Sequence, residues 1–250
     1  MGLNVAEILS EVGRKYCQPE EIAEMNRILK EKPGLLAVEQ TLLGLYFPYP
    51  CRVLVIGCGV GRESIALAKQ GYRVTGIDIA KPLIADARRN AIAENARVNF
   101  QETNGLHLEM ADKSFDLVVI FSQVIEHIPT RQARIEHLKE VRKVLVPNGF
   151  LFLTAHDRYH PSMSVLSSVF DVISESGSEE GDVFLKNVQG IESKGKAFMH
   201  YSAPDEIRTE LAEAGFNVWQ FARHSQLGGD PDMDRLFYMV CSSQSLESTL

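Results

Sequence analysis

The segment VLVIGCGVGRES, residues 53–64, joins an apolar run to a cluster of glycines. The apolar run shows no alternation with polar residues, which predicts a strand buried on both faces. It is followed, in G-x-G-x-G spacing, by Gly57, Cys58, Gly59 and Gly61. Glycine permits a sharp turn and close approach of a ligand, and the start of the next helix favours an anionic group. The segment therefore predicts either a ligand-binding turn or simply a tight connection between strand and helix.

Strand-like and helical patterns alternate from residue 51 onward, which predicts a mainly parallel, doubly wound α/β sheet. The expected strands are 52–57, 73–78, 97–101, 115–121 and 149–155, and the expected helices between them are 61–70, 82–95 and 131–145. The tripeptide 147–149, Pro-Asn-Gly, predicts a turn before the fifth strand. After a helix that ends near Ala214, the runs 216–221 and 234–241 are expected to form an antiparallel pair at one sheet edge.

Two regions lie outside this alternation. Residues 1–50 have mostly helical patterns and are expected to cap one end of the sheet, ahead of a domain that spans 51–250. Residues 156–200 interrupt the last strand-to-helix connection and are too long for a simple loop, so we expect a functional lid there. Within this insertion, the small and acidic run 174–182 predicts a mobile turn.

The composition is that of a globular protein, because 45% of the 250 residues are hydrophobic and 24% are charged. A net charge of −7 argues against an extended nucleic-acid interface, which needs a basic face. The four cysteines include no C-x-x-C pair, which favours reduced thiols in a cytoplasmic protein. We expect no secretion signal and no membrane span, since no apolar run approaches ~20 residues.

Asp78 adds a second, independent observation. It ends the expected strand that follows the glycine turn, where a carboxylate can accept hydrogen bonds from both hydroxyls of a ribose. The alternative is an ordinary cap for the helix that begins near Pro82. Together, the glycine turn and Asp78 predict an adenosine-containing ligand at the carboxyl ends of the strands.

These motifs resemble those of the Rossmann-like (class I) S-adenosylmethionine-dependent methyltransferases, over residues 51–241. VLVIGCGVG is similar to the first motif of that family, and VTGIDIA (74–80) is similar to its acidic second motif. The stretches 114–128, 144–154 and 206–216 resemble its fourth strand and following helix, the approach to its fifth strand and a late helix and turn. The resemblance implies a seven-stranded sheet with an antiparallel last strand. It also implies S-adenosylmethionine as cofactor and S-adenosylhomocysteine as product.

The resemblance further implies which residues contact the cofactor. The glycine turn would line its methionine and ribose portions, Asp78 would hold the ribose, and the Ser122 carbonyl would lie near the methionine ammonium. Val55 stands where the family commonly has an acidic residue, so we expect weaker cofactor binding. Arg62 would either pair with the cofactor carboxylate or face solvent. The adenine would contact Ile79, Asn104 and Gly105, with Asn104 standing in for the usual Asp.

His127, in QVIEHIP (123–129), is the first candidate for a catalytic base. In members of the family that act on small molecules, a histidine at this place assists deprotonation; the alternative is a structural Glu-His pair. Glu126 and His127 also resemble part of an E-x-x-E-H metal site. Because Gln123 replaces the first carboxylate, we expect no metal.

His156 is the second catalytic candidate, because residues just beyond a strand end face the crevice. His160 and His200 are expected to be polar surface or hinge residues near the lid. Basic residues interleaved with acidic ones predict a solvated face on the helix 131–145, formed by Arg131, Arg134, Lys139, Arg142 and Lys143. Aromatic residues that either build an acceptor pocket or simply pack are Tyr16, Tyr46, Tyr159, Phe170, Phe198 and Tyr201.

The sequence therefore predicts an enzyme that transfers a methyl group to an oxygen or nitrogen atom of a small molecule. Such a reaction needs mainly an aligned nucleophile and exclusion of water. The alternatives are transfer to a tRNA or a protein, and a cofactor-binding regulatory module without turnover. A nicotinamide dehydrogenase is disfavoured by the glycine spacing. The oligomeric state stays open.

Overall fold

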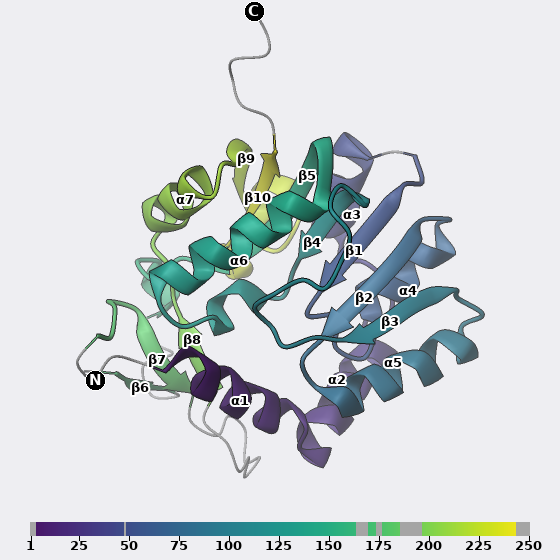
Figure 1. The fold of residues 1–250 in the computed structure, drawn as a ribbon, viewed down its shortest axis with the longest axis horizontal. Helices are drawn as coiled ribbons and strands as arrows, with labels where there is room; N and C mark the ends of the chain where they lie inside the picture. Colours follow the sequence, from purple (N-terminus) through teal and green to yellow (C-terminus); the bar gives the residue numbers. More distant parts are fainter. Residues whose placement is uncertain (1–3, 48, 164–169, 174–176, 186–196, 244–250) are drawn as a thin grey trace, which may run out of the picture.

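A computed structural model gives the structure of the chain and describes residues 4–47, 49–163, 170–173, 177–185 and 197–243. Its centre is a seven-stranded sheet between two layers of helices (Figure 1). The strands are β1 (Arg52–Ile56), β2 (Arg73–Asp78), β3 (Val98–Glu102), β4 (Phe115–Ile120), β5 (Leu145–His156), β9 (Asn217–Arg223) and β10 (Leu236–Ser242).

The strand order is β3-β2-β1-β4-β5-β10-β9. Strands β1 to β5 are parallel, and β10 lies antiparallel to both β5 and β9. The predicted doubly wound sheet with an antiparallel pair at one edge is therefore confirmed. The helices of this domain are α4 (Arg62–Lys69), α5 (Lys81–Ala93), α6 (Arg131–Val144) and α7 (Pro204–Glu213).

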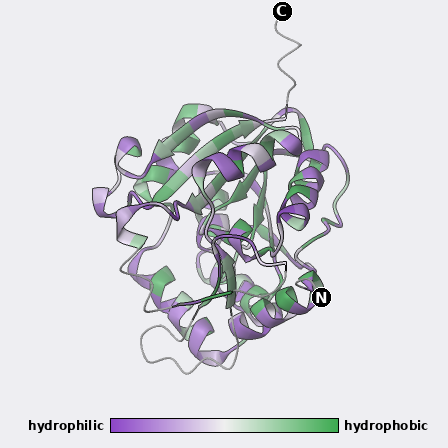
Figure 2. Cartoon of the chain, turned by 90° about the vertical axis from the view of Figure 1, so that its left-hand side faces the viewer, coloured by the Kyte–Doolittle hydropathy of each residue, from purple (hydrophilic) through white to green (hydrophobic). Residues whose placement is uncertain are grey.

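Side chains alternate between the two faces of the sheet, and each face packs against its own helices. Leu54 faces a core that includes Leu138 of α6 and Leu211 of α7. Its neighbour Val53 faces the opposite core, which includes Ile65 of α4 and Ile84 of α5. Figure 2 shows mostly hydrophobic colours along these central strands. Burial of both faces explains why the strand sequences are continuous apolar runs.

One predicted boundary is wrong. The tripeptide 147–149 lies inside β5 and does not separate that strand from α6. Leu145 at the end of α6 already pairs with Phe115, and the register on β4 then shifts so that Phe150 pairs with Leu117. Asn148 takes a left-handed conformation with φ +66°, which produces a bulge within one strand.

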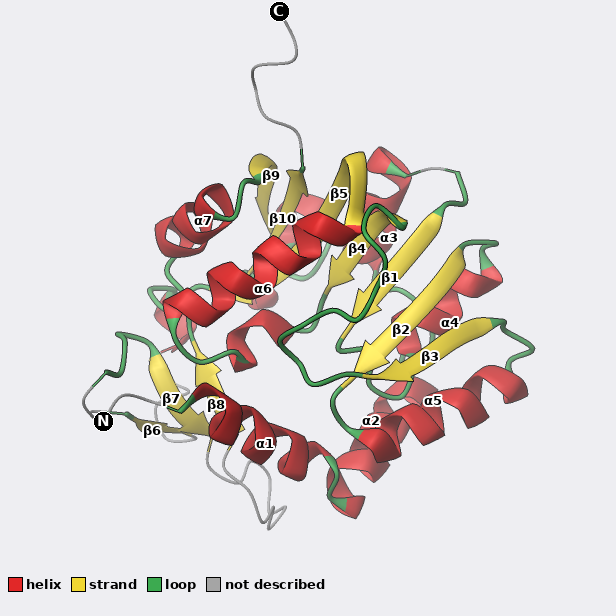
Figure 3. Ribbon diagram, viewed as in Figure 1, coloured by secondary structure: helices red, strands yellow, loops and turns green. Residues whose placement is uncertain are grey.

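Residues 4–47 form the helices α1 (Val5–Tyr16), α2 (Pro19–Glu31) and α3 (Ala37–Tyr46). The side chain of Asn4 caps α1 by accepting a hydrogen bond from the Glu7 N–H group. Helix α3 packs on the sheet through Val38 and Leu42. Helices α1 and α2 lie along the edge toward which the arrowheads of β1 and β2 point (Figure 3). They therefore cover the carboxyl ends of the parallel strands.

The insertion at 156–200 contains a second, three-stranded antiparallel sheet of β6 (Phe170–Val172), β7 (Asp182–Leu185) and β8 (Ala197–His200). It packs on α1, where Phe198 joins Ile8 and Val12 in one apolar cluster. The expected mobile turn at 174–182 is only partly described, because 174–176 lie outside the described residues. Asp182 begins β7 and is fully buried. Within the described ranges, no helix has both the length and the apolar character needed to cross a bilayer.

Candidate active site

A cavity of about 300 Å³ lies at the carboxyl ends of β1, β2 and β4, beneath α1 and α2. Polar residues from the strand ends and apolar residues from the two helices share its lining. The structure brings most of the predicted cofactor residues together there: Gly57, Cys58, Gly59, Arg62, Asp78, Ile79, Gly105 and Ser122, with the candidate base His127. Gly61, Asn104 and His156 do not line this cavity.

The glycines of the turn serve different purposes. Gly57 has φ +69°, and a Cβ there would lie 2.4 Å from Cγ2 of Val124, so a side chain is excluded by the protein itself. A Cβ on Gly59 would meet only Met25 Sδ, at 3.7 Å, and would project into open cavity space. A left-handed φ of +52° and ligand access both favour the glycine at 59, whereas the contact with Val124 also requires the one at 57.

Asp78 is held in a fixed orientation at the end of β2. Its Oδ2 accepts from the Gly59 N–H group at 2.8 Å, and its Oδ1 accepts from the Ala80 N–H group at 2.9 Å. Burial raises the pKa of this carboxyl group, and the backbone N–H groups of Ala80, Gly59 and Ile79 offset the effect only in part. Each carboxylate oxygen can accept a further hydrogen bond, so the group can still receive ribose hydroxyls.

Ile79 and Gly105 lie against each other on the β2–β3 side of the cavity, since a Cβ on Gly105 would be 2.9 Å from Cγ2 of Ile79. Asn104 does not face the cavity with them. Its Oδ1 accepts from the N–H groups of Leu106 and His107, at 2.9 and 3.0 Å. This local turn occupies the amide oxygen that the resemblance had assigned to the adenine.

Arg62 is largely buried and is bound by other residues of the chain. Its side chain is 13% exposed and donates to both oxygens of Glu39, to Glu63 and to the Gly34 carbonyl. Burial disfavours its charge, but Glu63 and Glu39 outweigh that effect and raise its pKa. The solvent-facing alternative is therefore wrong, and the role with a cofactor carboxylate remains a prediction.

The sequence analysis missed Glu63, a buried carboxylate in the cavity lining. It lies in the first turn of α4, where an acidic residue usually needs no explanation beyond the helix dipole. Burial raises its pKa, and the attraction of Arg62 offsets this only in part. Only the packing of α3 against α4 shows that this carboxylate is enclosed.

His127 belongs to the short helix η1 (Val124–His127) and lies inside the cavity. Its Nδ1 is 2.8 Å from the Phe198 carbonyl oxygen, and its Nε2 is 3.0 Å from the Tyr16 hydroxyl. A carbonyl only accepts, so Nδ1 carries the proton and Nε2 accepts from Tyr16. Burial lowers the pKa of His127. The ring is therefore neutral at pH 7 and presents a basic nitrogen to the cavity.

His156 lies behind the cavity wall, contrary to the prediction. Glu126 is fully buried, and both of its carboxylate oxygens contact His156. Oε1 accepts from the His156 backbone N–H at 2.7 Å, and Oε2 lies 2.7 Å from His156 Nδ1. The Gln123 side chain donates to the Thr154 hydroxyl at 3.3 Å. The Glu126–His156 pair thus links η1 to β5 and does not face the acceptor space.

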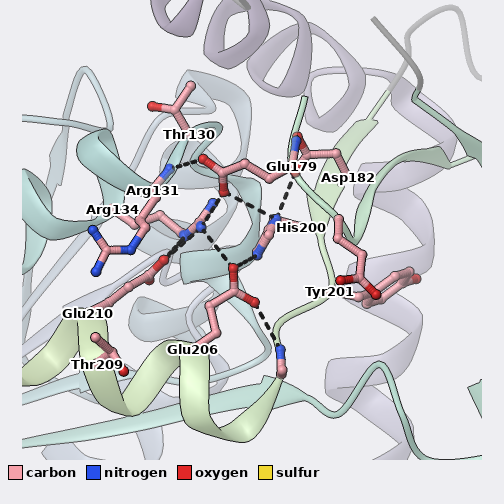
Figure 4. A network of polar contacts seen from close by, with 12 residues as sticks. Thr130, Arg131, Arg134, Glu179, Asp182, His200, Tyr201, Glu206, Thr209 and Glu210 are labelled. Atoms are coloured by element: carbon pink, nitrogen blue, oxygen red, sulfur yellow. Dashed lines mark hydrogen bonds and ion pairs between the residues drawn. The ribbon is translucent and has the colours of Figure 1, made fainter. Parts of the chain in front are cut away.

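Arg134 and His200 also differ from their predictions, because both side chains are fully buried. Nε and Nη2 of Arg134 bind the carboxylate of Glu210 on α7, and Nη2 also binds Glu179 in the insertion at 2.7 Å. Ring nitrogens of His200 lie 2.7 Å from Asp182 and 3.3 Å from Glu206. Figure 4 shows these groups converging from α6, α7 and the insertion. We call this set the clamp: Arg134, Glu179, Asp182, His200, Glu206 and Glu210.

Three of the clamp residues, Glu179, His200 and Glu206, bring potential metal ligand atoms within 4.8 Å of one another. The positive charge of Arg134 lies beside them, and Nδ1 of His200 is directed at Asp182. The guanidinium of Arg134 already supplies a cation to these carboxylates, so the chemistry of these donors fits an ion-pair network.

The remaining aromatic and histidine candidates lie in different parts of the fold. Tyr16 lines the cavity, whereas Tyr46 donates to Gln220 on the far side of the sheet. Tyr201 packs edge-on against His156, and Tyr159 is exposed. His160 contacts Ser162 in the insertion.

The geometry is accordingly that of a nucleotide cradle joined to a mainly apolar chamber, whose lining includes the imidazoles of His127 and His137. Residues 53–149 match the family described as methyltransferase domain. This chain therefore contains a methyltransferase domain, and its sheet has the strand order of the class I fold. S-adenosylmethionine is the methyl donor of this class, and Gly59, Asp78 and Ser122 fit it with an open cradle and a fixed carboxylate.

Individual proteins extend the similarity over most of the methyltransferase chain. A putative methyltransferase of Bacillus subtilis, YqeM, is 26% identical over 219 residues, which cover 80% of this chain and 88% of that protein. A SAM-dependent methyltransferase from Methanosarcina mazei has the same fold, with a TM-score of 0.67 and 24% identity over 80% of this chain and 96% of the other.

A third protein, the 1,6-didemethyltoxoflavin-N1-methyltransferase of Burkholderia thailandensis, was solved with 1,6-didemethyltoxoflavin and S-adenosylhomocysteine bound. Its TM-score is 0.67 at 16% identity, covering 97% of this chain and 92% of that one. At this identity the likeness concerns the fold.

Proposed function

We propose that this chain transfers a methyl group from S-adenosylmethionine to an oxygen or nitrogen atom of an uncharged, mainly apolar small molecule. The nature of the chamber beside the cofactor residues supports this acceptor. Among the described residues that line the cavity, the charged side chains are Arg62, Glu63 and Asp78, all next to the glycine turn. The chamber beneath α1 and α2 is lined by Leu9, Val12, Met25, Ile28, Leu29 and Ile128. An anionic acceptor would find no cation in that part of the lining.

The single observation that carries the proposal is the pairing of His127. The Phe198 carbonyl fixes the tautomer, so Nε2 is unprotonated, and the Tyr16 hydroxyl is its hydrogen-bond partner among the described residues. An acceptor hydroxyl or N–H group that takes the place of the Tyr16 hydroxyl at Nε2 can give its proton to that nitrogen as its heteroatom is methylated. The cofactor supplies an electrophilic methyl carbon, and α1 and α2 cover the chamber with apolar side chains that limit the access of water.

The proposal is tested by methyl transfer from tritiated S-adenosylmethionine to a panel of phenols, catechols and N-heterocycles. With any acceptor that is methylated, His127→Asn should lower kcat by about 10²–10⁴. Its affinity for S-adenosylhomocysteine should stay within about threefold of wild type. His160→Asn is the matched control, because His160 lies outside the cavity lining. Full turnover by His127→Asn would show that the ring is structural.

Methylation of tRNA or protein, with no transfer to any small molecule, would overturn the acceptor assignment. We also infer a cytoplasmic location. The support for it is that Cys17, Cys51, Cys58 and Cys241 are all free thiols, as expected in a reducing compartment.

A further inference from the structure

A buried group of charged side chains beside the cavity contains more negative than positive charge. Glu39 and Glu63 are both buried, with 3% and 7% exposure, and they share one guanidinium, that of Arg62. In the part of the chain that the structure describes, Arg62 is the one cation that forms an ion pair with either carboxylate. A buried carboxylate without full compensation is costly unless a cation joins it.

The two carboxylates are not equivalent. Glu39 accepts from Arg62 through both oxygens and from the Leu36 N–H group, so it completes the cap of α3. Glu63 shares Arg62 with it and receives a longer contact, 3.4 Å, from the Ser122 hydroxyl. Glu63 lines the cavity, whereas Glu39 does not. The uncompensated charge is therefore presented to the ligand by Glu63.

Arg62 is in turn committed to the protein. Nη1 donates to Gly34 and Glu39, and Nη2 donates to Glu39 and Glu63, so both terminal nitrogens of the guanidinium have two acceptors each. This arrangement satisfies the hydrogens on those nitrogens. Binding of a ligand carboxylate by the same nitrogens would require one of these contacts to break.

The sheet order shows which end of the cofactor would meet Glu63. Asp78 ends β2, and Gly105 lies beyond β3, so the adenosine portion belongs on that side of β1. Ser122 follows β4, which is the neighbour of β1 on the other side. The amino-acid tail must then extend across the glycine turn toward Ser122, and Glu63 lies beside Ser122.

We propose that Glu63 binds the α-ammonium group of the cofactor and that this contact selects for an intact amino-acid tail. The inference rests on the proposed function only for the identity of the cofactor. It also explains how the chain compensates for Val55, which stands where the resemblance leads one to expect an acidic residue. A carboxylate from α4 takes the place of one from β1.

A binding experiment with three ligands isolates this contact. Calorimetry would compare S-adenosylhomocysteine, its deamino analogue S-adenosyl-4-thiobutanoate and 5′-methylthioadenosine, which lacks the tail. Glu63→Gln should weaken S-adenosylhomocysteine by roughly thirtyfold or more, as expected for loss of one partner of an enclosed charge pair. The same change should leave 5′-methylthioadenosine within about threefold. It should leave the deamino analogue unchanged or tighter, because a repulsion between two carboxylates is removed.

Two controls keep the result interpretable. Glu94→Gln removes an exposed carboxylate paired with Lys69 and should change no affinity. Retained binding of 5′-methylthioadenosine shows that Glu63→Gln is folded. An equal loss for all three ligands, or an unchanged affinity for S-adenosylhomocysteine, would overturn the role of Glu63. Failure of the wild-type chain to bind any of the three would instead overturn the cofactor assignment.

Discussion

Two buried clusters of charge, the clamp and the group Glu39–Arg62–Glu63, use the same side chains for different purposes. Each places an arginine between glutamates inside the protein. In the clamp, the carboxylates are bound by cations and backbone N–H groups from α6, α7 and the insertion. In the second group, one carboxylate opens onto the cavity. A buried charge that is fully paired within the chain holds elements together, whereas a buried charge that is only partly paired indicates a position where a ligand binds.

The clamp matters for the site because of where the insertion lies. Glu179, Asp182 and His200 belong to the insertion, while Arg134 and Glu210 belong to the helices on the sheet. β8 ends at His200, and the same strand supplies the Phe198 carbonyl that holds His127. The clamp therefore fixes the strand that sets the tautomer of the candidate base.

The largest effect should follow from Arg134→Met. Removing the guanidinium leaves Glu210 and Glu179 without their shared cation, which should lower the free energy of unfolding by about 3–5 kcal/mol. Urea denaturation at pH 7 measures this. Lys139→Met on the exposed face of the same helix is the control and should change stability by less than about 0.5 kcal/mol. Similar values for both variants would break the distinction between clamp and surface charge.

A second prediction compares one glutamate from each cluster. Glu210→Gln should destabilise the protein by about 1–3 kcal/mol, because it weakens a charge-assisted pair in the closed clamp. Glu63→Gln without ligand should stay within about 1 kcal/mol of wild type, because Arg62 keeps its contacts with Glu39 and the Gly34 carbonyl. Burial raises the pKa of both carboxyl groups, so the expected difference comes from their partners and not from that shift. Equal destabilisation by the two changes would contradict the comparison.

The smallest effect concerns pH. Burial opposes the charge of Glu206, but contacts with His200, the Ala203 N–H group and Arg158 lower its pKa to about 2. Its contribution to stability is present above the unfolded value near 4.5 and is lost as the pH falls toward 2. Glu206→Gln should remove about 1 kcal/mol of that acid dependence, allowing for solvent around a partly exposed group. Unfolding measured at pH 6 and pH 3 tests it, and an unchanged slope would exclude this group as the cause.

His200 should act in the opposite direction. Burial disfavours its charge, but the Asp182 and Glu206 contacts outweigh this and raise its pKa above the usual 6.5. The stability that it contributes is therefore full below pH 6.5 and is lost as the pH rises through the raised value. Unfolding of His200→Asn compared with wild type at pH 6 and pH 9 should show a flatter alkaline limb. A parallel loss at both pH values would contradict it.

The elements that the sequence predicted correctly depend on local pattern. Apolar runs and helical spacing predicted the parallel strands and their helices, and the glycine turn and Asp78, which the sequence placed together, line one cavity. These features are set by neighbours in the chain and by the rule that ligands bind at the carboxyl ends of such strands.

The errors involve partners that are distant in the sequence or hydrogen bonds that compete locally. The sequence pattern predicts Arg134 to be a surface residue, because its partners Glu179 and Glu210 lie far away in the sequence, in the insertion and in α7. His156 reads as a crevice residue until Glu126 is seen to bind it. Asn104 matches a family position, but its own turn occupies its oxygen. A pattern of spacing contains none of this information.

The central claim is that the glycine turn and Asp78 form the binding site for the sulfur nucleoside. Calorimetric titration of S-adenosylhomocysteine into wild type and Asp78→Asn tests it most directly. We expect one site per chain in wild type and an affinity lower by about 1–3 kcal/mol in Asp78→Asn, because the ribose hydroxyls lose a charged acceptor. No binding at millimolar concentration, or equal affinity for both proteins, would contradict it.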